Sequence, residues 1–230
     1  MYKNKTFLGI IPARGGSKRL PEKNILNLHG KPLLVWTIEA ALKTQYLDKI
    51  VVSSDDDKIL DIVHKFKVHA LKRPVELASD NATSFDTVKH VLDRLKKYNY
   101  VVLLQPTSPL RNEKHIDKAI ALLEEKDADA VISVCEINHN PMWINTLNDS
   151  LSMQDFLNNR TFNKKNQDSE KYYRLNGAIY ICKTDKLIEE KGFFLRENIY
   201  AFKMDKESSI DIDEQIDFQL AETLLGTMFD

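Results

Sequence analysis

Apolar, strand-like stretches alternate with helix-like stretches along most of the chain, and this alternation limits the fold more than any other feature. The stretch Phe7–Ala13 is almost continuously apolar, as expected of a parallel strand buried on both faces. Further strands are predicted at Ile50–Ser54, Lys67–Leu71, Val101–Leu104, Ala130–Glu136, Gly177–Cys182 and Ile199–Met204. Helices are predicted at Pro32–Leu42, Lys58–Phe66, Phe85–Lys96 (with Ser84 as N-cap), His115–Leu123, Lys186–Glu190 and Asp213–Leu225. The alternation predicts a three-layer α/β/α fold, in which helices cover both faces of a parallel sheet.

The size and charge of the chain exclude several classes of protein. Its 230 residues suit one α/β domain, 1–230, and 43% hydrophobic residues provide for a sizeable core. The net charge of −1 argues against a general nucleic-acid or membrane-surface binder. Cys135 and Cys182 lie in strand-like runs without metal-ligand spacing, so we expect reduced core thiols. With no signal-peptide pattern and no apolar run of about 18 residues, we expect a cytoplasmic protein that does not enter a membrane.

One segment, from about Ile137 to Tyr173, interrupts the α/β alternation. It is rich in asparagine and carries Met142 and Trp143 directly after Pro141. It is too long for an ordinary loop within a compact domain. A flexible surface excursion and an element that contacts a partner are both consistent with this composition.

The first predicted strand leads into a basic loop with two glycines. Within ten residues this loop carries Arg14, Lys18, Arg19 and Lys23, and Gly15-Gly16 allows the backbone to approach a ligand closely. Exposed N–H groups with nearby cations form a phosphate cradle. The loop lacks both the P-loop ending and the three-glycine dinucleotide spacing, so it predicts a phosphate site of another kind. A solvated basic loop is the alternative.

Other polar residues follow the predicted strands, where ligands bind in doubly wound sheets. Ser53-Ser54-Asp55 follows one strand, and the segment from Gln105 to Arg111 follows another. Asp211 and Asp213 lie two residues apart, so an extended backbone places both carboxylates on one side. Paired carboxylates beside phosphates are a natural Mg²⁺ site. Helix capping is the alternative role for Asp213, and also for Ser108 or Asn112.

Five blocks of this sequence resemble blocks of the CMP-sialic acid synthetases (acylneuraminate cytidylyltransferases), and they follow one another in the same order as in that family. This family of sugar-activating nucleotidyltransferases has a Rossmann-like fold. The resemblance runs from the first strand to the last helix and rests on Ile10–Asn24, Arg73–Ala78, Leu104–Arg111, Arg174–Tyr180 and Ser209–Asp213. Several ordered blocks are far more specific than any single one.

The resemblance implies an Mg²⁺-dependent transfer of CMP from CTP to a nonulosonic (sialic-type) acid, with release of pyrophosphate. It implies that the 137–173 segment is a small dimerisation element and that the protein is a homodimer. The catalytic residues would be Arg14, Lys23 and Asp211. CTP would be bound by Arg14, Ser17, Lys18, Lys23, Asn24, Arg73 and Ser84, and the metal by Asp211 and Asp213. The sugar acid would be bound by Gln105, Thr107, Ser108, Lys165, Tyr180, Phe193 and Phe194.

The sequence departs from the family pattern at two places. Relatives usually carry an arginine where this chain has Lys165 or Asn166, and lysine lacks the bidentate fork of arginine. Ala82 replaces a frequent serine, so Thr83 is a candidate for the lost contact. Core packing is the alternative role for the aromatic residues Tyr180, Phe193 and Phe194. A cytidylyltransferase for the eight-carbon acid Kdo, and a non-catalytic nucleotide-binding protein on the same fold, are the alternative functions.

Overall fold

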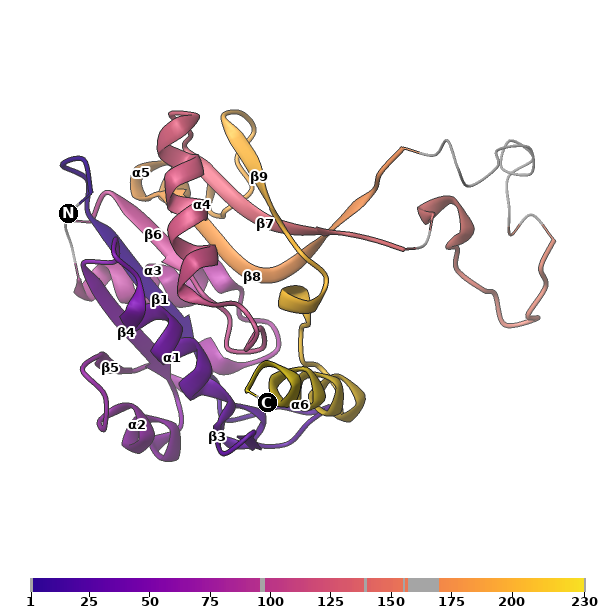
Figure 1. Cartoon of the computed structure of the whole chain (residues 1–230), viewed down its shortest axis with the longest axis horizontal. Coiled ribbons are helices and arrows are strands. Elements are labelled where there is room, and N and C mark those ends of the chain that lie inside the picture. The colour runs from indigo at the N-terminus through magenta and orange to yellow at the C-terminus, as the bar shows by residue number, and fades with distance from the viewer. Residues whose placement is uncertain (1, 96–97, 139, 155, 157–169, 230) are drawn as a thin grey trace.

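The protein is built around a seven-stranded sheet (Figure 1) in a computed structural model that describes residues 2–95, 98–138, 140–154, 156 and 170–229. The strand order is β5-β4-β1-β6-β8-β7-β9. The strands are β1 (Phe7–Pro12), β4 (Lys49–Ser54), β5 (His69–Lys72), β6 (Tyr100–Leu103), β7 (Ala130–Glu136), β8 (Tyr173–Lys183) and β9 (Ile199–Met204). A separate small ribbon pairs β2 (Asn27–Leu28) with β3 (Lys31–Pro32).

The sheet is mostly parallel, with one strand reversed. β1 pairs in parallel with β4 and β6, β4 with β5, and β7 with β9. β8 runs antiparallel to both of its neighbours, β6 and β7. The prediction of an all-parallel sheet is therefore wrong for β8. The physical reason is its connection: the chain leaves β7 at Ile137 and returns directly beside it at Tyr172, so β8 pairs with β7 as the returning, antiparallel arm.

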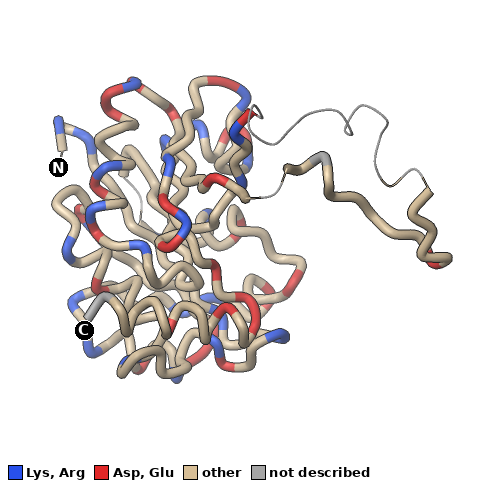
Figure 2. Tube along the Cα trace, turned by 45° about the vertical axis from the view of Figure 1, so that its right-hand side comes forward, with Lys and Arg blue, Asp and Glu red and all other residues tan. Residues whose placement is uncertain are grey.

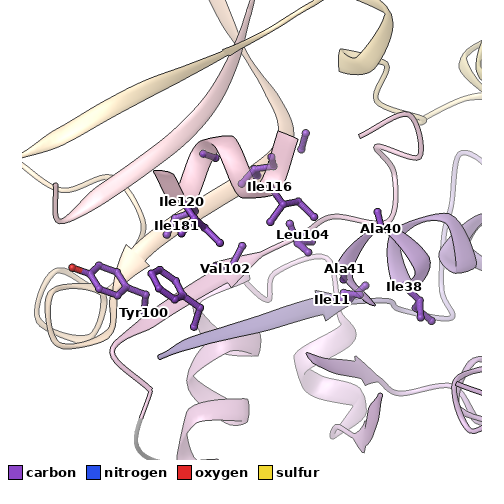
Figure 3. Packing of buried hydrophobic residues seen from close by; sticks show 14 of the residues in the cluster. Ile11, Ile38, Ala40, Ala41, Tyr100, Val102, Leu104, Ile116, Ile120 and Ile181 are labelled. Carbon is purple, nitrogen blue, oxygen red and sulfur yellow. The ribbon is translucent and has the colours of Figure 1, made fainter. Parts of the chain in front are cut away.

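Helices cover both faces of the sheet because successive strand residues point to opposite sides. In β1, Phe7 and Ile11 belong to one core cluster, whereas Leu8 and Ile10 belong to the other. The first cluster is completed by α1 (Leu33–Lys43), α2 (Asp57–Val63) and α4 (Glu113–Glu125), and Figure 3 shows Ile38 of α1 and Ile116 and Ile120 of α4 among its residues. The second cluster is completed by α3 (Ser84–Arg94) and α5 (Thr184–Glu190).

The helix α6 (Gln215–Phe229) lies beside the β2–β3 ribbon (Figure 1) and not over the middle of the sheet. Phe218, Ala221 and Leu225 of this helix pack with Leu20 and Leu28 in a third core cluster. This cluster joins the last helix to the loop after β1, beside the phosphate-binding candidates.

Helix capping differs from the prediction at the start of α3. The N-cap is Thr83 and not Ser84, because the Thr83 hydroxyl accepts from the Asp86 N–H at 3.2 Å while the Asp86 carboxylate accepts from the Thr83 N–H at 2.8 Å. The Thr83 side chain is thereby engaged in a capping box. Asn112 caps α4, as proposed for it, and Asp56 caps α2.

The described part of the segment between β7 and β8 projects away from the body, whereas basic and acidic residues are interspersed along the chain of the body itself (Figures 1 and 2). It contains the short 3₁₀ turn Pro141–Trp143, and Asp149 is the one charged residue among the described residues 140–154. None of the helices in the described part of the chain combines the length and apolar character that crossing a bilayer would require.

Candidate active site

A cleft of about 440 Å³ opens where the loops after β1, β5 and β6 converge. It brings together residues that are far apart in the sequence, including both aspartates of the Ser209–Asp213 block. Ten of the residues predicted for the site line it: Arg14, Ser17, Lys23, Asn24, Arg73, Ser84, Gln105, Thr107, Asp211 and Asp213.

The first loop is shaped by the acidic residues that follow β4. A Cβ on Gly15 would lie 2.4 Å from Oδ2 of Asp56, and the Gly15 N–H donates to Oδ1 of Asp55 at 3.2 Å. A residue without a Cβ is therefore required at Gly15 by the nearby Asp56 carboxylate, and not only by the close approach of a ligand. Asn24 fixes the other end of the loop by donating to the Arg14 carbonyl at 2.8 Å, while its buried Oδ1 has no partner within the described residues.

Arg73 is buried in the wall of the cleft and is not an exposed loop arginine. It donates to the Thr87 hydroxyl at 2.9 Å and lies 3.8 Å from the Asp55 carboxylate. Burial lowers the pKa of Arg73 and the Asp55 charge opposes that shift. Its Nε has no hydrogen-bond partner within the described residues, so a donor remains for a bound group.

Two aspartates hold the cations of the first loop. Asp80 accepts from Arg14 at 2.9 Å and from Lys18 at 2.5 Å. Asp213 lies 2.9 Å from Arg19 and 3.2 Å from Lys23. Asp80 was not predicted from the sequence: it lies in the loop after the 3₁₀ turn Val75–Ala78, where no periodicity or spacing marks it.

Lys23 is the most deeply held of these cations. It starts the short 3₁₀ turn Lys23–Ile25, is buried, and donates to the Ile212 carbonyl at 2.5 Å. Ile212 points into the third core cluster while Asp211 and Asp213 line the cleft. The predicted alternation of this segment is confirmed, whereas the capping alternative for Asp213 is wrong, because α6 begins at Gln215 and Asp213 pairs with cations.

Buried hydrogen bonds join the Arg174–Tyr180 block to the Ser209–Asp213 block. Asn176 donates to the Ser209 hydroxyl at 2.9 Å, and Arg174 donates to the Ser209 carbonyl at 3.1 Å. The Ser133 hydroxyl donates to the side-chain oxygen of Asn176 at 2.5 Å. Ser133 lies where the register of the β7–β8 pairing shifts. We call Ser133, Asn176 and Ser209 the buried clasp. It holds the segment that presents Asp211.

Gly177, next to the clasp, makes room for two polar side chains of the cleft. Its φ of +74° is a conformation that residues with a Cβ rarely adopt. A Cβ there would lie 3.4 Å from the Asp211 carboxylate and 3.5 Å from Oε1 of Gln105. Glycine therefore allows Asp211 and Gln105 to approach the same stretch of β8 backbone.

Asp211 has the electrostatic properties of a cation ligand. Its Oδ1 is buried and makes no hydrogen bond within the described residues. Burial raises the pKa of Asp211 and the Asp213 charge raises it further, while the Thr107 hydroxyl and the charges of Lys23 and Arg174 lower it. A bound cation would relieve the cost of burying this carboxylate.

A buried arginine, for which no role was predicted from the sequence, supports the loop that carries Gln105. Arg111 donates to the Thr37 hydroxyl at 2.7 Å and to the Gln105 carbonyl at 3.4 Å. Burial lowers the pKa of Arg111 to about 9. A residue of this kind is difficult to predict because an arginine after a proline-rich loop reads as exposed.

Several predicted site residues do not line the cleft. Ser108 is fully buried. Tyr180 contacts Phe193 and Phe194, with ring centroids 5.7 and 6.2 Å apart, and burial and the Asp211 charge raise its pKa. Phe193 is a core residue, as the alternative had it, whereas Phe194 is exposed. Lys18 is absent from the cleft lining but is paired with Asp80, and Lys165 lies outside the described residues.

Comparison with known sequences places these residues in a family. A family model described as cytidylyltransferase matches residues 8–229. An N-acylneuraminate cytidylyltransferase of Escherichia coli is 41% identical over 95% of this chain and 52% of its own. A CMP-N,N'-diacetyllegionaminic acid synthase of Legionella pneumophila is 35% identical over 95% of this chain and 96% of its own. A pseudaminic acid cytidylyltransferase of Campylobacter jejuni is 32% identical over 94% and 95%. The chain spans about half the length of the N-acylneuraminate cytidylyltransferases of Escherichia coli and Streptococcus agalactiae.

Solved structures share the fold. A CMP:2-keto-3-deoxy-manno-octonic acid synthetase complexed with CTP superposes with a TM-score of 0.75, at 18% identity, over 97% of this chain and all of the other. A 4-diphosphocytidyl-2C-methyl-D-erythritol synthase of Anaerococcus prevotii gives 0.68 at 18% identity, over 96% of each chain. These likenesses bear out the predicted Rossmann-like α/β fold. With a family model that covers nearly the whole sequence and relatives of 32 to 35% identity matched over their full length, the chain belongs to the cytidylyltransferase family.

Proposed function

We propose that this protein is a cytidylyltransferase that forms a CMP-activated nonulosonic acid of the sialic type from CTP and the free sugar acid. A hydroxyl oxygen of the sugar attacks the α-phosphorus, the bond between the α- and β-phosphates breaks, and pyrophosphate leaves. The observation that carries the proposal is the cleft itself, where buried Arg73 and Lys23 and half-buried Asp211 converge on one space. The names of the sequence relatives support the sugar class.

The side chains divide between the two ends of the nucleotide. Arg14, Ser17, Lys18 and Lys23 would neutralise the triphosphate and the departing pyrophosphate, which is the main task in phosphoryl transfer. Arg73, with its free Nε–H, and Ser84 would contact the nucleoside. Gln105 and Thr107 would hold the sugar hydroxyls in line with the α-phosphorus. Tyr180 and Phe194 would border the sugar.

We further propose a Mg²⁺ ion at this site. Asp211 fits such an ion because its Oδ1 is buried and unpartnered, whereas Asp213 already contacts two cations and would have to release one. The described residues contain no group of three or more His, Cys, Asp or Glu placed to hold a metal, which suits an ion that takes most of its ligands from phosphates and water. When bound, the ion would neutralise phosphate charge and lower the pKa of the attacking hydroxyl.

The decisive experiment is a panel of sugar acids with CTP and Mg²⁺, following pyrophosphate release. Nonulosonic acids should be turned over, and the eight-carbon acid Kdo should not. CTP should be preferred to UTP and ATP. Equal turnover of ATP would exclude the proposed base pocket, and a protein that binds CTP but releases no pyrophosphate with any acid would be the non-catalytic alternative.

Two further parts of the proposal concern the whole protein. The 137–173 segment would form a homodimer, and the cytoplasmic location stays a prediction from the sequence. The departure at Lys165 leaves the identity of the sugar acid to the substrate panel.

A further inference from the structure

Asp80 pairs with two of the four cations of the phosphate cradle at once. Its Oδ1 lies 2.9 Å from Arg14 and its Oδ2 lies 2.5 Å from Lys18, so each carboxylate oxygen pairs with one cation. Asp80 and Arg14 both line the cleft. The two cations lower the pKa of Asp80, so the carboxylate is charged throughout the physiological range. A protein carboxylate thus lies among the groups assigned to the triphosphate.

These pairs are of the kind that a stronger anion displaces. The side chains of Arg14, Asp80 and Lys18 are 39%, 49% and 83% exposed. Exposed ion pairs are screened by water and salt and contribute little stability. A polyphosphate carries more negative charge than one orthophosphate or chloride ion, so it competes better with the Asp80 carboxylate for the two cations.

Arg14 has a second anchor that does not depend on Asp80. Its guanidinium also donates to the Ala78 carbonyl at 3.4 Å. The other loop cations have separate partners: Lys23 has the Ile212 carbonyl, and Lys23 and Arg19 share Asp213. Removing the Asp80 charge therefore frees the cradle without releasing the arginine from the wall.

We propose that Asp80 is a specificity residue, an internal counter-anion that a polyphosphate displaces from Arg14 and Lys18 more readily than a smaller anion does. It keeps small anions out of the empty cradle and returns to the cations as pyrophosphate leaves. This inference rests on the proposed function, because it takes Arg14 and Lys18 to be the phosphate-binding groups. If Asp80 has this role, neutralising this acidic residue should strengthen the binding of anions at the site.

The test is a direct measurement of pyrophosphate binding by calorimetry, without divalent cations and at fixed ionic strength. Asp80→Asn should bind pyrophosphate about threefold to tenfold more tightly than the wild type, which is the range expected for the loss of two exposed ion pairs. Orthophosphate should bind measurably to the variant and only weakly to the wild type. The variant should fold normally, which thermal unfolding would verify, because Asp80 is half exposed.

Glu22→Gln is the matched control. Glu22 belongs to the same first loop and is about as exposed as Asp80, at 54%, but it pairs with Lys58. This variant has the same change in net charge and should leave pyrophosphate affinity nearly unchanged. In an Arg14→Ala background, Asp80→Asn should lose most of its effect, because one of the two cations it frees is gone.

The outcomes separate the inference from the function on which it rests. Wild-type protein that binds pyrophosphate, with unchanged or weaker binding in Asp80→Asn, would overturn the role of Asp80 and leave the phosphate site standing. An equal gain in Glu22→Gln would overturn it as well, since the effect would then be one of net charge. Absence of pyrophosphate binding in both proteins would contradict the phosphate site itself and Asp80 with it.

Discussion

Individual side chains at this site differ in how firmly the protein holds them, and this should set the effect of their loss. Arg14 has only exposed or partly buried contacts, with Asp80 and the Ala78 carbonyl. Its loss should leave the fold intact. Arg14→Ala should lower kcat/KM by roughly 10²-fold, as for other preorganised donors that meet developing charge. Pyrophosphate release at varied CTP concentration measures this, and a loss of less than threefold would remove Arg14 from the catalytic set.

Asp211→Asn isolates a charge, because asparagine keeps the size and shape of the side chain. Turnover should fall by orders of magnitude across a Mg²⁺ titration, and Asp213→Asn should do less harm. Stability should move the other way. Since burial raises the pKa of Asp211 in the folded protein, its charged form destabilises the fold above that pKa. The variant should therefore be at least as stable as the wild type at pH 7.

The stability difference should shrink as the pH falls through the raised pKa, where the wild-type carboxyl becomes neutral. Urea unfolding at several pH values would measure it, with Asp213→Asn as the comparison because Asp213 is exposed and cation-paired. Near-normal turnover and Mg²⁺ dependence in Asp211→Asn would mean that the metal is held elsewhere.

At the scale of elements, the buried clasp makes the position of Asp211 depend on β7 and β8. Ser209→Ala leaves the buried Asn176 amide without its 2.9 Å partner, which should cost about 1–3 kcal/mol in the free energy of unfolding. Turnover should also fall, and its Mg²⁺ midpoint should rise, because the Ser209–Asp213 segment loosens. Ser208→Ala is the control: its hydroxyl donates to the Asp205 carboxylate at 3.1 Å and, among the described residues, makes no bond to Asn176. An unchanged Mg²⁺ midpoint in Ser209→Ala would reduce the clasp to a stabilising role.

The elements also show what the sequence could and could not predict. Ala130–Glu136 and Ile199–Met204 have the predicted bounds, because continuous apolar or alternating runs mark strands strongly. β8 begins at Tyr173 and not at Gly177, since its first three residues are exposed and do not form the buried apolar run that marks a central strand. Its reversed direction depends on long-range pairing that local patterns do not contain. The site residues within the five family blocks were predictable from the sequence. Asp80 was not, because no pattern marks its loop and its partners Arg14 and Lys18 are distant in the sequence.

At the scale of the whole molecule, the protein is a compact body with a projecting segment (Figure 1). In the described part of that segment, Trp143, Ile144, Leu147, Leu151 and Met153 are exposed. At its base the outgoing and returning arms are joined to each other by the Ile137–Tyr172 hydrogen bond, at 3.0 Å, and by the Glu136–Lys171 ion pair. These apolar side chains lie outside the hydrophobic core and add nothing to its packing. Exposed apolar surfaces of this kind mark contacts with partners.

If the projecting segment forms a homodimer, a polar residue within it should weaken association. Ile144 is 67% exposed, and Ile144→Ser should raise the dimer dissociation constant about tenfold or more, the usual effect of losing an apolar anchor at an interface. Ile216→Ser is the matched control, because Ile216 is equally exposed, at 67%, but lies on α6 of the body. Light scattering at micromolar concentration should give twice the chain mass for the wild type and the control, and a concentration-dependent lower mass for Ile144→Ser. A monomeric, fully active wild-type protein would refute the dimer, and equal weakening by both substitutions would place the interface somewhere other than this segment.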